Sequence, residues 1–267
     1  DTSFMLCLSR NMTAVKRNKT KTYRCPSHKG NKISLKKGTF LENAKLDYSV
    51  FIKICYCWSM ERPIFRAVEE LGLDKKTIIT WYQHFRDVCS RFLIKNEYQI
   101  GGVGHIVQID ESLVAKAKHN VGRWPKQRWI FGGYDVVEKI GFLILVEDRR
   151  ENTLLHYIKR FIKPGTTIHS DKWSSYNNIE TISVTPPFKH YSVNHSLHFK
   201  DPITGTHTNH VECYWKNAKR KFKIMAGVQT STLASHLDEF MWRELHGKCG
   251  GLIMNHILRQ IALEYPL

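Results

Sequence analysis

The middle of the chain constrains the fold most, because its hydrophobic pattern changes from strand-like to helix-like and back to strand-like. Short apolar runs at 103–109, 128–133 and 141–146 predict three consecutive strands. Apolar residues then recur at helical spacing over 153–162, and a fourth strand is predicted over 166–170. This alternation is typical of an α/β fold in which helices flank a mixed sheet.

Two aspartates lie where predicted strands end. Asp110 follows the strand 103–109, and Asp171 follows the strand 166–170. Side chains at such positions project from a rigid backbone into the crevice outside the sheet, which suits a metal ligand. Three strands, a helix and a strand with a terminal carboxylate are the element order of an RNase H-like fold. We therefore predict an RNase H-like mixed sheet flanked by helices.

A third carboxylate is expected from a helix packed against this sheet, and the candidate is Glu212 in the segment 208–222. Apolar residues recur there at intervals of four, three and four, so one stripe packs inward and Glu212 lies one position off it. Lys216, Lys219 and Lys223 follow on the same flank and form a basic edge beside the acid. Two Asp and one Glu supply hard oxygen ligands, which favour Mg²⁺ or Mn²⁺ over zinc.

Each acid also has an ordinary structural interpretation. Asp110 and Asp171 can cap turns, and Glu212 can form an i,i+4 pair with Lys216. Considered together, however, the three acids present a contradiction. The positive charge of the chain attracts a phosphate backbone, whereas three clustered carboxylates would repel it. A bound divalent metal removes that contradiction.

The charge of the chain predicts a polyanionic partner. Its 267 residues include 41 Lys plus Arg against 24 Asp plus Glu, a formal net charge of +17. A hydrophobic content of 42% excludes wholesale disorder. No apolar run approaches the roughly 18 residues of a membrane span, and we find neither a secretory leader nor a Walker-type nucleotide motif. Seven irregularly spaced cysteines favour a reducing compartment. We therefore expect an intracellular protein, nuclear in a eukaryote and otherwise cytoplasmic, with no membrane or nucleotide partner.

Composition divides the chain into four parts. Residues 1–45 form a Lys-rich basic segment, 46–99 have a helical pattern, 100–245 contain the predicted sheet, and 246–267 form a C-terminal helical tail. The predicted order is thus a basic arm, a helical region, an α/β domain and a short tail.

The helical part has the spacing of a helix-turn-helix over residues 68–81. A Gly lies at the predicted turn, and Asp74 can cap the second helix. Lys75 and Lys76 would then lie at the helix end that meets DNA bases. An ordinary helical hairpin, whose apolar residues are only core residues, fits the same spacing.

Several short motifs resemble those of the Merlin superfamily of DNA transposases and of related bacterial insertion-sequence transposases. In chain order they are Ile100–Gly104, Ile109–Ser112, Trp129–Gly133, Lys163–Ile168, Ser170–Trp173, Tyr191–Ser196 and Gly205–Asn209 with Val211 and Glu212. The resemblance extends from residue 24 to about residue 245 and keeps the order of the family.

This resemblance implies a cut-and-paste DDE transposase with a helical DNA-binding part and a zinc-ribbon-like segment before its RNase H-like core. The catalytic and metal-binding acids would be Asp110, Asp171 and Glu212, with two Mg²⁺ or Mn²⁺ ions. They would cleave the transposon end, and the freed 3′-hydroxyl would attack target DNA. The implied partner is double-stranded DNA, in the form of terminal repeats and target, bound by a homo-oligomer.

Three polar residues near the acids are candidate supporting groups, namely His195, His207 and Asn209, although structural polar residues at a helix start fit equally well. At the N-terminus, Cys7 and Cys25 with His28 could ligate zinc. Positions 4 and 10 are Phe and Arg, so no CxxC pair is complete; the zinc-ribbon-like segment is degenerate and zinc binding is in doubt.

Two other functions fit parts of this pattern. A domesticated or inactive transposase-derived DNA-binding protein would keep the basic surface without transposition. An RNase H-like nuclease or resolvase would share the acids without the long series of matching motifs.

Overall fold

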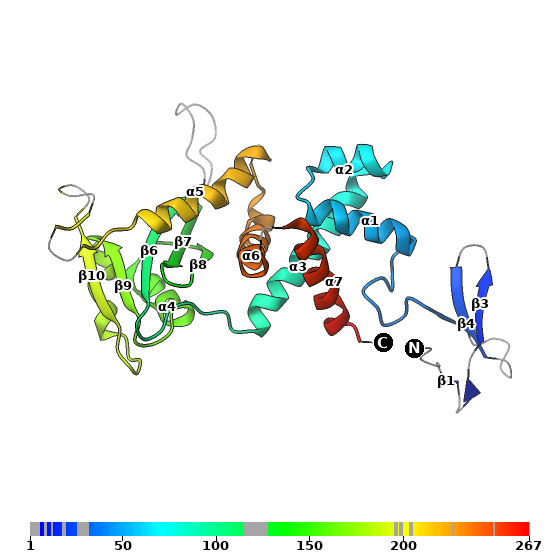
Figure 1. Cartoon of the computed structure of the whole chain (residues 1–267), viewed down its shortest axis with the longest axis horizontal. Helices are drawn as coiled ribbons and strands as arrows, with labels where there is room; N and C mark the ends of the chain where they lie inside the picture. The colour runs from blue at the N-terminus through cyan, green and yellow to red at the C-terminus, as the bar shows by residue number, and fades with distance from the viewer. Residues whose placement is uncertain are drawn as a thin grey trace. The chain divides into compact units, whose positions relative to one another are not determined.

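The computed structural model describes residues 6–7, 10–11, 13–17, 20–25, 32–114, 128–194, 197, 200–202, 205–225, 227–247 and 249–266. The chain forms two compact units, one of residues 1–78 with 250–267 and the other of residues 79–249. Each unit is described separately below (Figure 1). Among the described residues, no helix combines the length and apolarity needed to cross a membrane.

A five-stranded mixed sheet forms the centre of the larger unit (Figure 1). Its strands are β6 (Ile106–Leu113), β7 (Trp129–Asp135), β8 (Ile140–Val146), β9 (Thr167–Asp171) and β10 (Lys189–Val193). The spatial order is β10-β9-β6-β7-β8. β6, β7 and β8 pair antiparallel in sequence, whereas β9 is parallel to β6 and β10 is parallel to β9. The predicted mixed α/β class and three-strand meander are confirmed, and β10 is an element that the sequence patterns missed.

The position of Asp110 in its strand differs from the prediction. β6 begins later than predicted and continues to Leu113, so Asp110 lies inside the strand instead of closing it. The parallel pairing with β9 ends at Gln108↔His169, but the antiparallel pairing with β7 continues through Asp110↔Gly132 to Leu113↔Trp129. The strand is extended because β7 supplies backbone partners on one edge only. Asp171 is the last residue of β9, as predicted.

Two helices of the larger unit lie beside opposite faces of this sheet. α4 (Glu151–Phe161) lies beside the 3₁₀ turn η1 (Ser174–Tyr176), and a second 3₁₀ turn, η2, covers Ile179–Thr181. α5 (Asn209–Ile224) packs on β6 and β7. Trp215 of α5 sits so close to Gly132 that any Cβ there would lie 2.9 Å from the indole. The predicted inward stripe of α5 is buried, and it holds this helix close above Asp110's strand.

The larger unit is completed by α6 (Thr230–His246) and by α3 (Lys75–Lys95) from residue 79 onward. A buried ion group joins three of its helices. Glu239 of α6 accepts hydrogen bonds from Lys221 Nζ of α5 at 2.8 Å and from Arg243 Nε at 2.9 Å. Burial opposes the charge of Glu239, but Lys221 and Arg243, with Arg86 of α3, hold the pKa of Glu239 well below its usual range. These contacts fix the C-terminal half of α5.

The smaller unit contains the helix α2 (Ile64–Leu71), a glycine turn and the first residues of α3, which continues into the larger unit. α2 ends at Gly72, whose φ of 62° is the left-handed conformation that glycine adopts without strain. Asp74 Oδ1 accepts the N–H of Lys76 at 2.8 Å and so caps the start of α3. α2, the turn at Gly72 and the start of α3 thus follow one another in the chain, and a DNA-binding helix-turn-helix stays a prediction.

The C-terminal helix packs within this smaller unit. α7 (Gly250–Glu264) contacts α1 (Tyr48–Ser59), and its buried residues Ile253, Ile257 and Ile261 repeat at intervals of four. At Gly250 an added Cβ would lie 2.2 Å from the sulfur of Met60. Gly247 lies between α6 and α7, while Gly250 and Gly251 begin α7.

The basic N-terminal segment contains short strands that the sequence patterns did not indicate. They are β1 (Leu6–Cys7), β2 (Arg10–Asn11), β3 (Thr13–Arg17), β4 (Thr20–Arg24) and β5 (Lys32–Ser34). β3, β4 and β5 form an antiparallel sheet. Cys7 lies in β1, Cys25 directly follows β4, and His28 lies outside the described residues, so zinc binding there stays a prediction.

Candidate active site

Asp110 and Asp171 lie level with each other on adjacent parallel strands. β6 and β9 pair through Gln108↔His169, and these two acids follow two residues further along each strand. Because side chains alternate along a strand, both carboxylates point to the face that carries Gln108 and His169. The register therefore brings together two of the three predicted acids.

Helix α5 brings Glu212 to the same face. The side chain of Gln108, 1% exposed, accepts the N–H of His210 at 2.9 Å, and His210 belongs to the first turn of α5. This bond ties the start of the helix to the strand two residues before Asp110. Glu212 lies in the same first turn, is exposed, and accepts a hydrogen bond from Thr208 Oγ1 at 3.2 Å.

The electrostatics of Asp110 link the three acids. Burial, followed by the negative charges of Glu111 and Asp171, raises the pKa of Asp110 to about 7. The charge of Glu212 acts in the same direction. A hydrogen bond from the backbone N–H of Glu111 to Asp110 Oδ1, at 2.8 Å, only partly offsets these effects. The negative charge concentrated on this face is the kind that a bound cation stabilises.

The carboxylates have oxygen atoms available for a ligand. Asp110 Oδ1 accepts the N–H of Glu111, and Asp171 Oδ1 accepts the N–H of Trp173 at 3.1 Å. Each therefore retains a second oxygen that no described hydrogen bond uses. Within the described part of the chain, no three His, Cys, Asp or Glu side chains are already drawn close enough together to hold an ion.

A fourth carboxylate, Glu111, lies beside the predicted three. It points to the opposite face of β6 from Asp110, and the buried Tyr176 donates its hydroxyl to Glu111 Oε1. Burial raises the pKa of Glu111, while the bond from Tyr176 and the charge of Arg149 act against this rise. No periodicity in the sequence indicated this group, because its members come from β6, η1 and the segment before α4.

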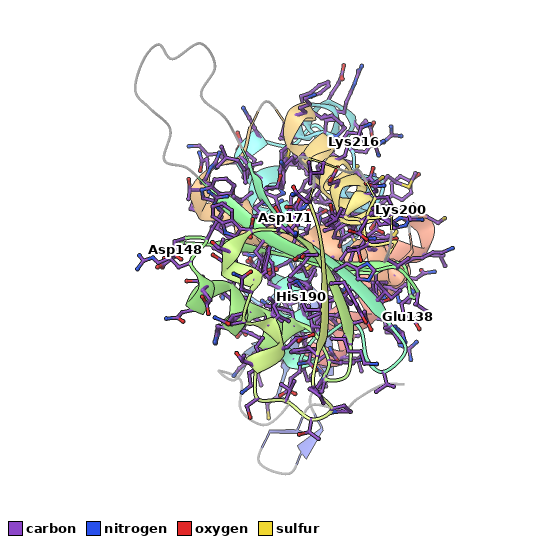
Figure 2. The ribbon with its side chains drawn as sticks, turned by 90° about the vertical axis from the view of Figure 1, so that its left-hand side faces the viewer. Glu138, Asp148, Asp171, His190, Lys200 and Lys216 are labelled. Atoms are coloured by element: carbon purple, nitrogen blue, oxygen red, sulfur yellow. The ribbon has the colours of Figure 1, made fainter. Side chains whose placement is uncertain are left out.

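The predicted basic residues lie on two different units. Lys216 and Lys223 are exposed on the α5 flank that starts with Glu212, and Lys219 Nζ donates to Ser112 Oγ of β6. Figure 2 shows Lys216 on this helix, and Asp171 and Glu138 toward opposite ends of the sheet. Lys75 and Lys76 are exposed at the start of α3. The basic flank of α5 thus runs along the strand that carries Asp110.

The predicted supporting residues have different surroundings. His207 Nδ1 lies 3.2 Å from Gln108 Nε2, and since an amide nitrogen only donates, His207 Nδ1 is the acceptor. Burial lowers the pKa of His207, which agrees with a neutral ring. Asn209 Oδ1 is buried and has no hydrogen-bond partner among the described residues. His195 lies outside the described residues.

The larger unit is thus a mixed α/β domain with acids on two neighbouring strands and on the helix packed against them. Residues 103–244 match the family of ISXO2-like transposase domains. The matched segment is just over half of the 267 residues, and it contains Asp110, Asp171 and Glu212. The chain belongs to this transposase family.

Other known proteins are similar to parts of the chain. An "uncharacterized transposase-like protein" of Haemophilus influenzae (strain ATCC 51907 / DSM 11121 / KW20 / Rd) is 26% identical over 102 residues, which are 38% of this chain and 78% of that protein. Two structures of the HTLV-2 integrase catalytic core domain in complex with magnesium, in dimeric and trimeric forms, each cover 53% of this chain and 84% of their own. Their identities are 9% and 12%, and their TM-scores are 0.33 and 0.34.

Proposed function

We propose that the chain is a DNA transposase of the DDE type, related to the Merlin superfamily, that cleaves DNA at transposon ends and joins the freed 3′-hydroxyl to target DNA. The observation that carries this proposal is that Asp110 and Asp171 lie on adjacent strands, while Glu212 lies in the first turn of α5, which packs on β6, all within the transposase-family segment. Double-stranded DNA is the substrate, and a homo-oligomer that pairs two ends is the expected assembly.

The donor set fits a hard divalent cation. All three acids offer carboxylate oxygen, and the repulsion that raises the pKa of Asp110 is relieved when positive charge binds among them. Asp110, Asp171 and Glu212 would hold Mg²⁺ or Mn²⁺. When bound, such ions supply activation of the attacking oxygen and stabilisation of the leaving oxygen.

The remaining residues position the DNA strand. Gln108 ties the first turn of α5 to β6 and so sets the approach of Glu212 to Asp110. Lys216 and Lys223, exposed along the flank that follows Glu212, offer positive charge to the phosphates of the strand that enters the site. In the smaller unit, Lys75 and Lys76 at the capped start of α3 are the proposed contacts for the transposon end.

Asp171→Asn tests the catalytic assignment. The amide keeps the size of the side chain and an acceptor for the N–H of Trp173, but it removes one ligand charge. We expect nicking of terminal-repeat DNA with Mg²⁺ to fall at least about a hundredfold, while gel-shift affinity in chelator holds or rises because a repulsive charge is lost. Asp148→Asn, on the segment before α4, is the matched control and should cleave like the wild type.

Two results would overturn this proposal. A variant that cleaves as fast as the wild type would remove Asp171 from the catalytic group. A wild type that binds terminal repeats tightly but never cleaves them would favour the alternative of a domesticated DNA-binding protein.

A further inference from the structure

We propose that Arg149, held between Trp129 and Trp173, binds a phosphate of the DNA strand that lies against the carboxylates. This inference rests on the proposed function, since it concerns the same substrate at the same edge of the sheet. It assigns a phosphate-binding role to a residue that lies outside the three acids and outside the basic flank of α5.

Two indole rings contact the guanidinium of Arg149. The central guanidinium carbon lies 3.8 Å from the ring centroid of Trp129 and 4.8 Å from that of Trp173. Cation–π contacts of this kind fix the plane of the group and leave its N–H donors at the edge. Among the described residues, the side chain of Arg149 makes neither a hydrogen bond nor an ion pair, so these donors are available to a ligand.

The stack lies at the rim of the candidate active site. Trp173 follows Asp171 by two residues and donates its backbone N–H to that carboxylate at 3.1 Å. Trp129 pairs with Leu113, three residues beyond Asp110 on β6, so its side chain lies on the face of the sheet that carries Glu111, and the stack reaches the carboxylates at the end of β9. Ser175 Oγ donates to the carbonyl oxygen of Arg149 at 2.9 Å, which anchors the segment before α4 to the turn that carries Trp173. The same turn therefore positions both Asp171 and the stacked arginine.

The charge around the stack favours an anion with a planar pair of oxygens. Asp148, the acid next in sequence, is paired with Arg150 Nε at 3.0 Å, while the positive charge of Arg149 acts on Glu111. Guanidinium groups bind phosphate through two parallel N–H···O bonds, which lysine cannot form. Trp173 is 39% exposed, so a strand can reach the edge of the guanidinium. One fixed cation here offsets the repulsion between a phosphate and the four nearby carboxylates.

The neighbouring arginines offer a matched comparison. Arg149→Gln and Arg150→Gln remove the same charge from adjacent positions, but only the first removes the stacked donor. Binding of a terminal-repeat duplex is measured in chelator by fluorescence anisotropy across a salt series. We expect Arg149→Gln to raise Kd about ten- to a hundredfold and to lower the salt slope by about 0.9, and Arg150→Gln to change Kd less than about threefold.

Arg149→Lys separates a stacked donor from simple charge. We expect it to keep the salt slope while recovering less than half of the lost binding free energy, because the planar fork is absent. Duplexes with a single neutral methylphosphonate, scanned through the cleaved strand near its end, locate the contact. One position should weaken wild-type binding and leave binding by Arg149→Gln unchanged, which is the non-additive result expected of a direct contact.

Equal losses for the two glutamine variants, or additive losses at every methylphosphonate position, would overturn the assignment of a phosphate site. Thermal melting of each variant identifies a loss of binding that is due to unfolding. The binding series is then repeated with Trp173→Phe, which keeps an aromatic ring beside Arg149. Cleavage by the wild type is scored separately with Mg²⁺. A wild type without cleavage contradicts the proposed function, whereas normal cleavage with equal glutamine variants contradicts only the role of Arg149.

Discussion

Asp110 is held in the folded protein at an electrostatic cost. Its carboxyl is buried beside Glu111 and Asp171, and its pKa is about 7, compared with roughly 3.9 in an unfolded chain. Native carboxyls that stabilise a fold normally have lowered pKa values, as Asp148 does through hydrogen bonds from Arg150 and Thr153. A carboxyl shifted the other way at the meeting point of two strands is a sign of a functional site.

Asp110→Asn should stabilise the metal-free protein in a pH-dependent way. A raised folded-state pKa means that stability is fully present below about pH 4 and is lost as the pH rises through about 7, where the folded carboxyl ionises. Replacing the acid by a neutral amide should therefore increase the free energy of unfolding by roughly 2–4 kcal/mol at pH 8 and by little at pH 4. Urea titrations in chelator at the two pH values measure the difference.

Asp148→Asn is the control, and it should give no stabilisation at pH 8, because the pKa of Asp148 is lowered. Equal effects of Asp110→Asn at both pH values would show that its charge does not cost the fold energy.

At the scale of elements, the link between β6 and α5 sets the candidate site. Gln108 forms this link, since its side-chain amide accepts a backbone N–H from the first turn of α5 and donates a hydrogen bond to His207. Because Gln108 is buried, water cannot take its place as the hydrogen-bond partner of these groups. The site consequently depends on one uncharged residue that carries no chemistry of its own.

Gln108→Leu should loosen α5 at its first turn. The substitution keeps a similar side-chain volume but leaves the N–H of His210 and the acceptor nitrogen of His207 without their partner. Each unsatisfied group should lower the free energy of unfolding by about 1–3 kcal/mol. Hydrogen exchange should become faster for the amides at the start of α5 and stay unchanged in α6. Gln99→Leu removes an exposed bond to the Arg160 carbonyl at 2.8 Å and serves as the control. Unchanged exchange at His210 would show that Gln108 does not hold the helix.

The elements of the sheet show how far periodicity carries a prediction. Apolar runs located β6, β7, β8 and β9 along the chain, because each strand has a buried face. β10 was missed, since Lys189–Val193 has one fully buried residue and its pairing with β9 is not local in sequence. The end of β6 was misplaced for a related reason. Its continuation depends on backbone pairing with β7, which side-chain pattern does not encode.

The candidate site was predictable to a different degree. Residue type and strand position indicated Asp110, Asp171 and Glu212, because acids beside apolar runs are visible in a sequence. The contacts of Glu111 with Tyr176 and of Arg149 with Trp129 join segments that meet only after the sheet has formed. Exposed aromatic and basic residues are common, so their stacking could not be inferred from spacing.

At the scale of the whole molecule, the chain divides between two compact units. The predicted acids all lie in the unit of residues 79–249, and the predicted helix-turn-helix lysines lie in the unit that α1, α2 and α7 build. The packing of α7 on α1 joins residues from the two ends of the chain, which is why the sequence patterns described a separate tail. Under the proposed function, such a division would allow DNA recognition and cleavage to be altered independently.

Lys75→Gln with Lys76→Gln should weaken DNA binding without changing catalysis on bound DNA. If both lysines contact phosphates, the slope of log K against log salt should fall by about 1.8, which is about 0.9 for each contact. At saturating terminal-repeat DNA the cleavage rate should equal that of the wild type, because the carboxylates lie in the other unit. Anisotropy across a salt series and single-turnover cleavage measure the two effects on the same preparation.

Lys139→Gln is the control for this pair, since Lys139 lies in the turn between β7 and β8, next to Glu138, which Figure 2 shows toward the other end of the sheet from Asp171. It should leave both the slope and the rate unchanged. The expected pattern is the reverse of that for Asp171→Asn, which loses cleavage and keeps binding. An unchanged slope in the double variant would remove the start of α3 from the DNA interface. A slower rate on saturated DNA would show instead that the lysines act in catalysis, and the division of work between the two units would then be wrong.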